Sequence, residues 1–220
     1  MALFRLKVVF QRGINWVLLL TIFTNCQKNA EETLPFYNSA DFTAEWITKE
    51  NPSYAKIHTI DAFSFTDQQG KTYSSDSLKD KIYVANFFFT ACPTICPKMT
   101  SNLSVLQDKF LTDKDFRMVS FSVTPWRDSV SRLKEYAEIH KINPSKWHML
   151  TGEKTQIYTL GRKSFFAEKT LGLIKDSTDF LHTESMLLID KKGRIRGVYS
   201  ATQEADIERV ADDIRVLLKE

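Results

Sequence analysis

The chain has 220 residues, of which 43% are hydrophobic and 26% charged, and its formal net charge is +3. Seven Gly and six Pro are too few for a fibrous or disordered protein, so the composition is that of one globular domain of ordinary size. The charge excess equals the contribution of Arg5, Lys7 and Arg12 at the amino terminus, and it gives no reason to expect a nucleic-acid partner.

The first 25 residues have the organisation of a secretory signal. Basic residues come first, a mostly apolar run follows from Ile14 to Phe23, and no acidic residue interrupts them. Because a membrane-spanning helix needs about 20 apolar residues, this run is too short to span a bilayer comfortably. We therefore predict that residues 1–25 direct the chain to export.

Cys26 follows the apolar run directly and resembles the lipidated cysteine of bacterial lipoproteins. Phe23, Thr24 and Asn25 replace the leucine and small residues usual in such signals, so an uncleaved anchor is the alternative. We predict that residues 26–55 form a tether. Residues 56–220 are then a domain in the cell envelope, anchored to the membrane through the N-terminal lipid or anchor and facing the periplasm or the outside.

The first part of this domain predicts a hairpin followed by a buried strand. Between residues 58 and 78 an alternating pattern is broken by Asp67-Gln68-Gln69-Gly70, which is a turn signal. Residues 82–89 (IYVANFFF) are almost all apolar and rich in β-forming types, as expected of a strand that is buried on both faces.

The rest of the chain alternates between helical and extended patterns. Apolar residues recur at helical spacing from Met99 to Phe110. A strand at 116–123 precedes a second helix, for which Asp128 is the predicted N-cap. The later predicted elements are a strand at 147–150, a helix at 153–167, a hairpin of strands 186–190 and 194–200, and an amphipathic helix through residues 207–218.

The order of these elements predicts an α/β fold. Alternating strands and helices imply neighbouring parallel strands with right-handed crossovers, and the hairpins add antiparallel strands. This is the pattern of a thioredoxin-like fold, with a central mixed sheet flanked by helices and an N-terminal hairpin. Sites in such sheets form at the carboxyl ends of the strands.

Cys92 and Cys96 lie at this position, between the strand 82–89 and the next helix. A structural disulfide is one interpretation, but closing a loop of about five residues stabilises a protein by only about 2 kcal/mol. A redox dithiol is the second, because the helix N-terminus would stabilise a thiolate on Cys96. A soft metal ion is the third, since two thiolates suit Cu(I).

Histidines could complete a metal site with the two cysteines. His182 lies just before the strand 186–190, and the loop that enters this strand passes over the cysteine loop in thioredoxin-like folds. We therefore take His182 as the candidate third ligand. The other histidines are predicted to be structural, as isolated histidines usually are: His58, His140 and His148.

Four segments of the chain are similar to the Sco/SenC family of copper chaperones, which are membrane-anchored proteins of the thioredoxin fold. The family's T-x-C-P-x-x-C-P motif is matched by TACPTICP, and its S-V-D-P-x-x-D motif by SVTPWRDS. Its leucine-threonine-glycine segment matches residues 150–152. Its distal histidine, which precedes L-I-D at a strand end, matches His182 before residues 188–190.

This resemblance implies that Cys92, Cys96 and His182 bind copper, as Cu(I) or Cu(II). It also implies that the protein helps to metallate the binuclear copper centre of cytochrome c oxidase subunit II, by delivering copper or by reducing that subunit's cysteines. Thr124 departs from the family, which usually has Asp in S-V-D-P, and a possible partner of the metal ligands is thereby lost. Leu181 and Thr183 also make the surroundings of the histidine less acidic than usual.

Two other classes of function remain open from the residues alone. A membrane-tethered thiol–disulfide oxidoreductase would need only Cys92 and Cys96, and a copper-responsive sensor would use the same ligands. Trp126 and Arg127 could form a surface that contacts a partner protein. The simpler expectation for this pair is a packed tryptophan and a solvated arginine.

Overall fold

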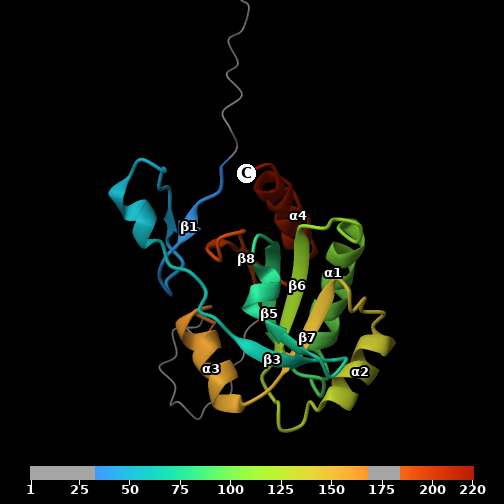
Figure 1. Cartoon of the computed structure of the whole chain (residues 1–220). Helices are drawn as coiled ribbons and strands as arrows, with labels where there is room; N and C mark the ends of the chain where they lie inside the picture. Colours follow the sequence, from blue (N-terminus) through green and yellow to red (C-terminus); the bar gives the residue numbers. More distant parts are fainter. Residues whose placement is uncertain (1–32, 168–183) are drawn as a thin grey trace, which may run out of the picture. The chain divides into compact units, whose positions relative to one another are not determined.

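The computed structural model of the protein describes residues 33–167 and 184–220 (Figure 1). Its centre is a seven-stranded mixed sheet in the order β4-β3-β7-β6-β5-β8-β9. The strands, in chain order, are β3 (Ser64–Asp67), β4 (Thr72–Ser74), β5 (Ile82–Phe88), β6 (Phe116–Ser122), β7 (Trp147–Thr151), β8 (Ser185–Ile189) and β9 (Ile195–Ser200).

The three central strands are parallel, and antiparallel strands lie on both sides of them. β6 pairs in parallel with β5 and with β7, while β3 and β4 form an antiparallel hairpin beside β7. β8 and β9 form a second antiparallel pair beside β5. The chain therefore has the predicted thioredoxin-like fold with its N-terminal hairpin.

β5 is buried on both faces, which explains its unbroken apolar run. All seven of its residues are buried, and successive side chains point to opposite faces of the sheet. Ile82, Val84 and Phe88 belong to one apolar core, and Tyr83, Ala85 and Phe87 to the core on the other face. A strand that is buried in two cores therefore contains almost no polar residues. Asn86 is the exception, and its side-chain oxygen accepts a hydrogen bond from the hydroxyl of Ser120 at 2.6 Å.

Helices cover both cores. α1 (Ile95–Lys109), α2 (Val130–Ile139) and α4 (Glu204–Lys219) pack on one face, and α3 (Lys154–Lys163) packs on the other (Figure 1). α1, α2 and α4 confirm the predicted helices. α3 ends earlier than predicted, because Phe166 adopts a left-handed backbone (φ 52°) that a helix cannot continue through.

The segment before the sheet contains two short strands, β1 (Phe36–Tyr37) and β2 (Ala44–Glu45), and a 3-10 helix, η1 (Pro52–Lys56). A second 3-10 helix, η2 (Ser75–Leu78), follows β4. Phe36 is buried, with its ring 4.7 Å from the guanidinium of Arg194 and 4.3 Å from that of Arg196. This segment is thereby attached to the turn between β8 and β9.

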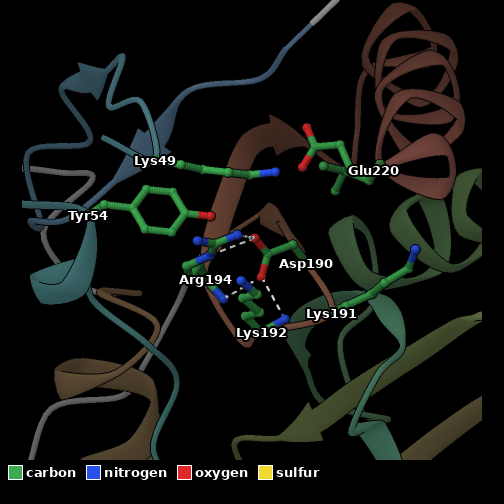
Figure 2. Close-up of a pocket in the computed structure, with 8 residues that line it drawn as sticks. Lys49, Tyr54, Asp190, Lys191, Lys192, Arg194 and Glu220 are labelled. Carbon is green, nitrogen blue, oxygen red and sulfur yellow. Dashed lines mark hydrogen bonds and ion pairs between the residues drawn. The ribbon is translucent and has the colours of Figure 1, made fainter. Parts of the chain in front are cut away.

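A charged pocket of about 100 Å³ lies between η1, this turn and the C-terminal end of α4 (Figure 2). Arg194 and Arg196 both pair with Asp190, at 2.7 and 3.3 Å, and Arg196 also pairs with Glu220 at 2.8 Å. The acids of the pocket are thus neutralised by the arginines, and the cluster joins the C-terminus to the sheet.

Within residues 33–167 and 184–220, no helix has both the length and the apolar character to cross a bilayer. The predicted signal, residues 1–25, and the predicted lipidation site, Cys26, lie outside the described residues.

Candidate metal centre

The two cysteines lie where β5 gives way to α1. β5 ends at Phe88, Cys92 is in the loop that follows, and Cys96 is the second residue of α1. Both are free thiols and both are buried, with 7% and 4% of their surface exposed. The sequence prediction that the pair stands at the carboxyl end of a central parallel strand is confirmed.

The Cys92 sulfur occupies the position of a helix cap. Thr94, the N-cap residue of α1, makes no capping hydrogen bond with its side chain. Instead the backbone N–H of Cys96 donates to Sγ of Cys92 at 3.3 Å. Burial acts to raise the pKa of Cys92, but this bond and further N–H groups of Thr94 and Ile95 outweigh it, and the pKa falls below its ordinary value.

Cys96 behaves in the opposite way. Burial, assisted by the neighbouring Cys92 sulfur and the charge of Asp128, raises the pKa of Cys96 to about 12. The prediction that the helix N-terminus would stabilise a thiolate on Cys96 is therefore wrong. Both cysteines border the same apolar core, but Sγ of Cys92 accepts the N–H of Cys96 in the first turn, whereas burial dominates at Cys96.

This asymmetry predicts an order of reaction. The thiolate is the form that iodoacetamide attacks, so a lowered pKa makes Cys92 reactive at lower pH than an ordinary cysteine. The raised pKa of Cys96 delays its reaction to strongly alkaline pH. We expect peptide mass spectrometry over a pH series to find Cys92 alkylated first. Alkylation of Cys96 before Cys92, or identical pH profiles for the two cysteines, would contradict the assignment.

A buried carboxylate fastens the cysteine loop to the loop after β6. Asp128 is fully buried and accepts hydrogen bonds from the hydroxyls of Thr90, Ser122 and Thr124, at 2.6, 2.5 and 2.9 Å. The N–H of Thr90 also donates to it at 3.3 Å. Since Thr90 lies two residues before Cys92, Asp128 holds the start of the loop that carries the thiol.

The predicted role of Asp128 as the N-cap of the second helix is wrong. Ser129 caps α2, accepting the N–H of Arg132 at 3.3 Å, and Asp128 turns inward. Thr124 donates to Asp128 through the hydroxyl that Asp at this position would lack. The sequence analysis does not identify Thr90 and Ser122 as hydrogen-bond donors to Asp128, although both lie within the two matched motifs.

The three described histidines have structural contacts, as predicted. Nε2 of His58 lies 2.8 Å from the carbonyl oxygen of Ser164, and the ring of His148 stacks on Tyr73 at 3.9 Å. His140 is the C-cap residue of α2, and burial lowers its pKa. In the described part of the chain, no three His, Cys, Asp or Glu side chains form a metal-binding group. His182 lies outside the described residues.

Trp126 is 58% exposed, so the expectation of a packed tryptophan is wrong, while Arg127 is exposed as expected. Trp126 lies in the turn between β6 and α2. Nζ of Lys154, in the first turn of α3, lies 5.0 Å from the centre of the indole ring.

Comparison with known proteins identifies relatives that match most of the chain. The SCO1/SenC family model matches residues 51–219. A SCO1/SenC family lipoprotein from Bacillus anthracis is 32% identical with a TM-score of 0.64, over 73% of this chain and 95% of that one. BsSco, described with a disulfide switch and as a member of the Sco family of cytochrome c oxidase assembly proteins, is 30% identical with a TM-score of 0.63, over 74% and 95%.

A third similar structure is that of ScoI from Bradyrhizobium japonicum, which was solved with copper bound. It is 26% identical to this chain with a TM-score of 0.58, over 72% of this chain and 99% of that one. The family match spans most of the chain, from residue 51 to residue 219. The chain therefore belongs to the SCO1/SenC family.

Proposed function

We propose that the protein is a membrane-tethered copper chaperone that assists assembly of the binuclear copper centre of cytochrome c oxidase subunit II. The observation that carries this proposal is the pair of free thiols at the start of α1, one of which receives the helix N–H groups. Two neighbouring sulfur ligands suit a soft ion such as Cu(I). The copper-bound ScoI and the oxidase-assembly role of the family of BsSco support the same assignment.

The proposed ligands are Sγ of Cys92, Sγ of Cys96 and the imidazole of His182. His182 precedes β8 by three residues, and β8 begins beside the end of β5, where Asn86 pairs with Met186. The family resemblance supports this choice, because the distal histidine of the family precedes L-I-D at a strand end, as His182 precedes residues 188–190.

Copper would pass to its acceptor by ligand exchange. A cysteine thiolate of the acceptor bonds to the ion before the last sulfur of the donor releases it, so the ion is never free in water. Pro93 and Pro97 restrict the loop, which lowers the conformational entropy lost on binding. Cys96 must give up its proton when it binds the metal, because its raised pKa keeps it protonated in the free protein at neutral pH.

The membrane attachment is part of this proposal. Residues 1–25 act as the export signal, Cys26 carries the lipid, residues 26–55 are the tether, and residues 56–220 form the copper-binding domain in the cell envelope. The Bacillus anthracis relative is a lipoprotein, in agreement with this organisation. In the described part of the tether, the burial of Phe36 fixes the chain to the domain surface.

A second candidate is a thiol–disulfide oxidoreductase that reduces the cysteines of a partner. The lowered pKa of Cys92 favours it, because the thiolate is the attacking form. Cys92 would attack the partner's disulfide and Cys96 would then release the partner. The partner's disulfide gains two electrons and two protons as Cys92 and Cys96 become a disulfide.

Copper titration of the reduced protein separates these functions. We expect one Cu(I) per chain and, with Cu(II), a thiolate-to-copper charge-transfer band. His182→Ala should remove the Cu(II) band and weaken Cu(I) binding less, because two thiolates can hold the softer ion. An oxidoreductase would bind no copper in the reduced state and would keep its reductase activity in the same variant.

A further inference from the structure

The exposed indole of Trp126 lies at the same edge of the sheet as the thiol loop. β5 and β6 are parallel neighbours that end together, with Phe88 opposite Ser122. The cysteine loop follows β5, and the turn that carries Trp126 follows β6. Asp128, two residues after Trp126, bonds the hydroxyl of Thr90, two residues before Cys92, at 2.6 Å. The N–H of Thr90 also donates to Asp128 at 3.3 Å, so two hydrogen bonds to this one carboxylate join the two loops.

The turn that presents Trp126 is held in place. The N–H groups of Arg127 and Asp128 both donate to the carbonyl oxygen of Thr124, at 2.8 and 2.9 Å. Nζ of Lys154 lies 5.0 Å from the centre of the indole ring and 5.2 Å from that of Tyr158, so the ring is supported from the α3 side. A large aromatic side chain that is already ordered in the free protein loses little entropy when a partner covers it.

The surroundings of the indole are positively charged. Arg127 and Lys154 are both exposed. The neighbouring acid, Glu153, caps α3 and accepts the N–H of Gln156 at 2.8 Å, and its negative charge offsets only one of the two cations. We call Trp126, Arg127 and Lys154 the Trp126 surface; it combines one aromatic anchor with two cations and would complement an apolar pocket bordered by carboxylates.

The thiols themselves offer little area to a partner. Only 7% of Cys92 and 4% of Cys96 are exposed, whereas Ala91, Pro93 and Thr94 around them are open to solvent. A protein that exchanges ligands or electrons with these sulfurs must press closely against the loop. A contact beside the loop is needed to hold it there, because the sulfurs contribute almost no surface of their own.

We propose that the Trp126 surface is the docking site for the protein that exchanges with Cys92 and Cys96. Its partner is a protein that presents a cysteine pair next to an apolar pocket with carboxylates at its edge. The indole supplies the anchor, and Arg127 and Lys154 orient the approach. This inference rests on the proposed function for the identity of the acceptor but not for the position of the surface.

The test uses the full chain, reduced, loaded with one Cu(I) and mixed with the copper-free soluble domain of cytochrome c oxidase subunit II from the same host. We expect Trp126→Ala to lower the second-order rate of copper transfer about 10-fold or more, as loss of an aromatic anchor does. Replacing Arg127 and Lys154 together by alanine should slow transfer and flatten its dependence on ionic strength.

Two controls isolate docking from the metal site. Trp46→Ala removes an indole that is 68% exposed, on the segment between β2 and η1, and should leave the transfer rate within about twofold. Transfer of Cu(I) to a small chelator such as bathocuproine disulfonate should be equally fast in the wild-type and Trp126→Ala chains, because a small molecule needs no docking surface.

The possible failures are distinguishable. The docking inference is wrong, and the proposed function stands, if the wild-type chain transfers copper and the Trp126→Ala chain transfers it to the acceptor domain equally fast. The same conclusion follows if Trp126→Ala slows the transfer of copper to the chelator as well as to the acceptor domain. If the wild-type chain moves no copper but reduces the disulfide of the same domain, the chaperone function is wrong and the variants are compared in that reaction. If it does neither, both are wrong.

Discussion

Cys92→Ser and Cys96→Ser should each abolish tight Cu(I) binding by the reduced protein. Each substitution removes one of the two sulfur ligands and leaves a hydroxyl, which is a poor ligand for a soft ion. Loss of a group that only orients a metal ligand costs about 10–100-fold in affinity, so loss of the ligand itself should cost well over about 100-fold. Competition with a Cu(I) chelator of known affinity measures the effect.

The chain offers a matched control in its third cysteine. In the chain without lipid, Cys26→Ser makes the same change outside the proposed centre and should leave one Cu(I) bound with unchanged affinity. Oxidation of Cys92 and Cys96 to a disulfide should remove Cu(I) binding as completely as the substitutions do, because neither sulfur is then a thiolate. A single serine variant that keeps the wild-type affinity would show that the copper site lies elsewhere.

The sheet and the position of the thiols could be predicted because they depend on local patterns. The apolar run of β5 and the helical spacing from Met99 to Leu106 record which faces are buried, and burial is the strongest constraint on a sequence. The motif TACPTICP then places both cysteines between a strand and a helix, whatever the details of the loop. Secondary structure and cysteine spacing were enough for this part of the site.

The electrostatics of the thiols could not be predicted, because they depend on which way a few N–H groups point. Sequence alone places Cys96 at the helix N-terminus, and a dipole argument then favours a thiolate there. In the structure both cysteines border the same core, and it is Sγ of Cys92 that accepts the N–H of Cys96. The path of the backbone between the two cysteines decides which sulfur receives this N–H group, and no pattern of residue types encodes it.

The same limit explains the two errors around Asp128. An aspartate just before an apolar helical pattern is a good N-cap candidate, and so is the serine that follows it. Only the neighbouring strand decides between them, because Thr90 comes from the end of β5 and supplies a donor from 38 residues away in the chain. Trp126 belongs to the same turn, in which Trp126 and Arg127 are exposed next to the buried Asp128.

Asp128→Ala should lower the free energy of unfolding by about 3 kcal/mol or more. The carboxylate is fully buried, and its removal leaves the hydroxyls of Thr90, Ser122 and Thr124 without their acceptor. Hydrogen bonds to a charged group contribute about 1.5–3 kcal/mol each, although the hydroxyls can turn to other acceptors and recover part of this loss. Urea unfolding at neutral pH measures the change as a lower midpoint with an unchanged slope.

Two further variants separate the network from a general loss of charge. Asp212→Ala removes an exposed carboxylate that pairs with Arg215 on α4, and it should change stability little. Asp128→Asn keeps the shape and one acceptor oxygen, and should therefore be less destabilising than Asp128→Ala. Because the network fastens Thr90 to the loop after β6, Asp128→Ala should also free the cysteine loop and blur the difference in alkylation between Cys92 and Cys96. An Asp128→Ala protein as stable as the wild type, with the same alkylation order, would mean that the loop is held by its packing against α1 and not by the buried carboxylate.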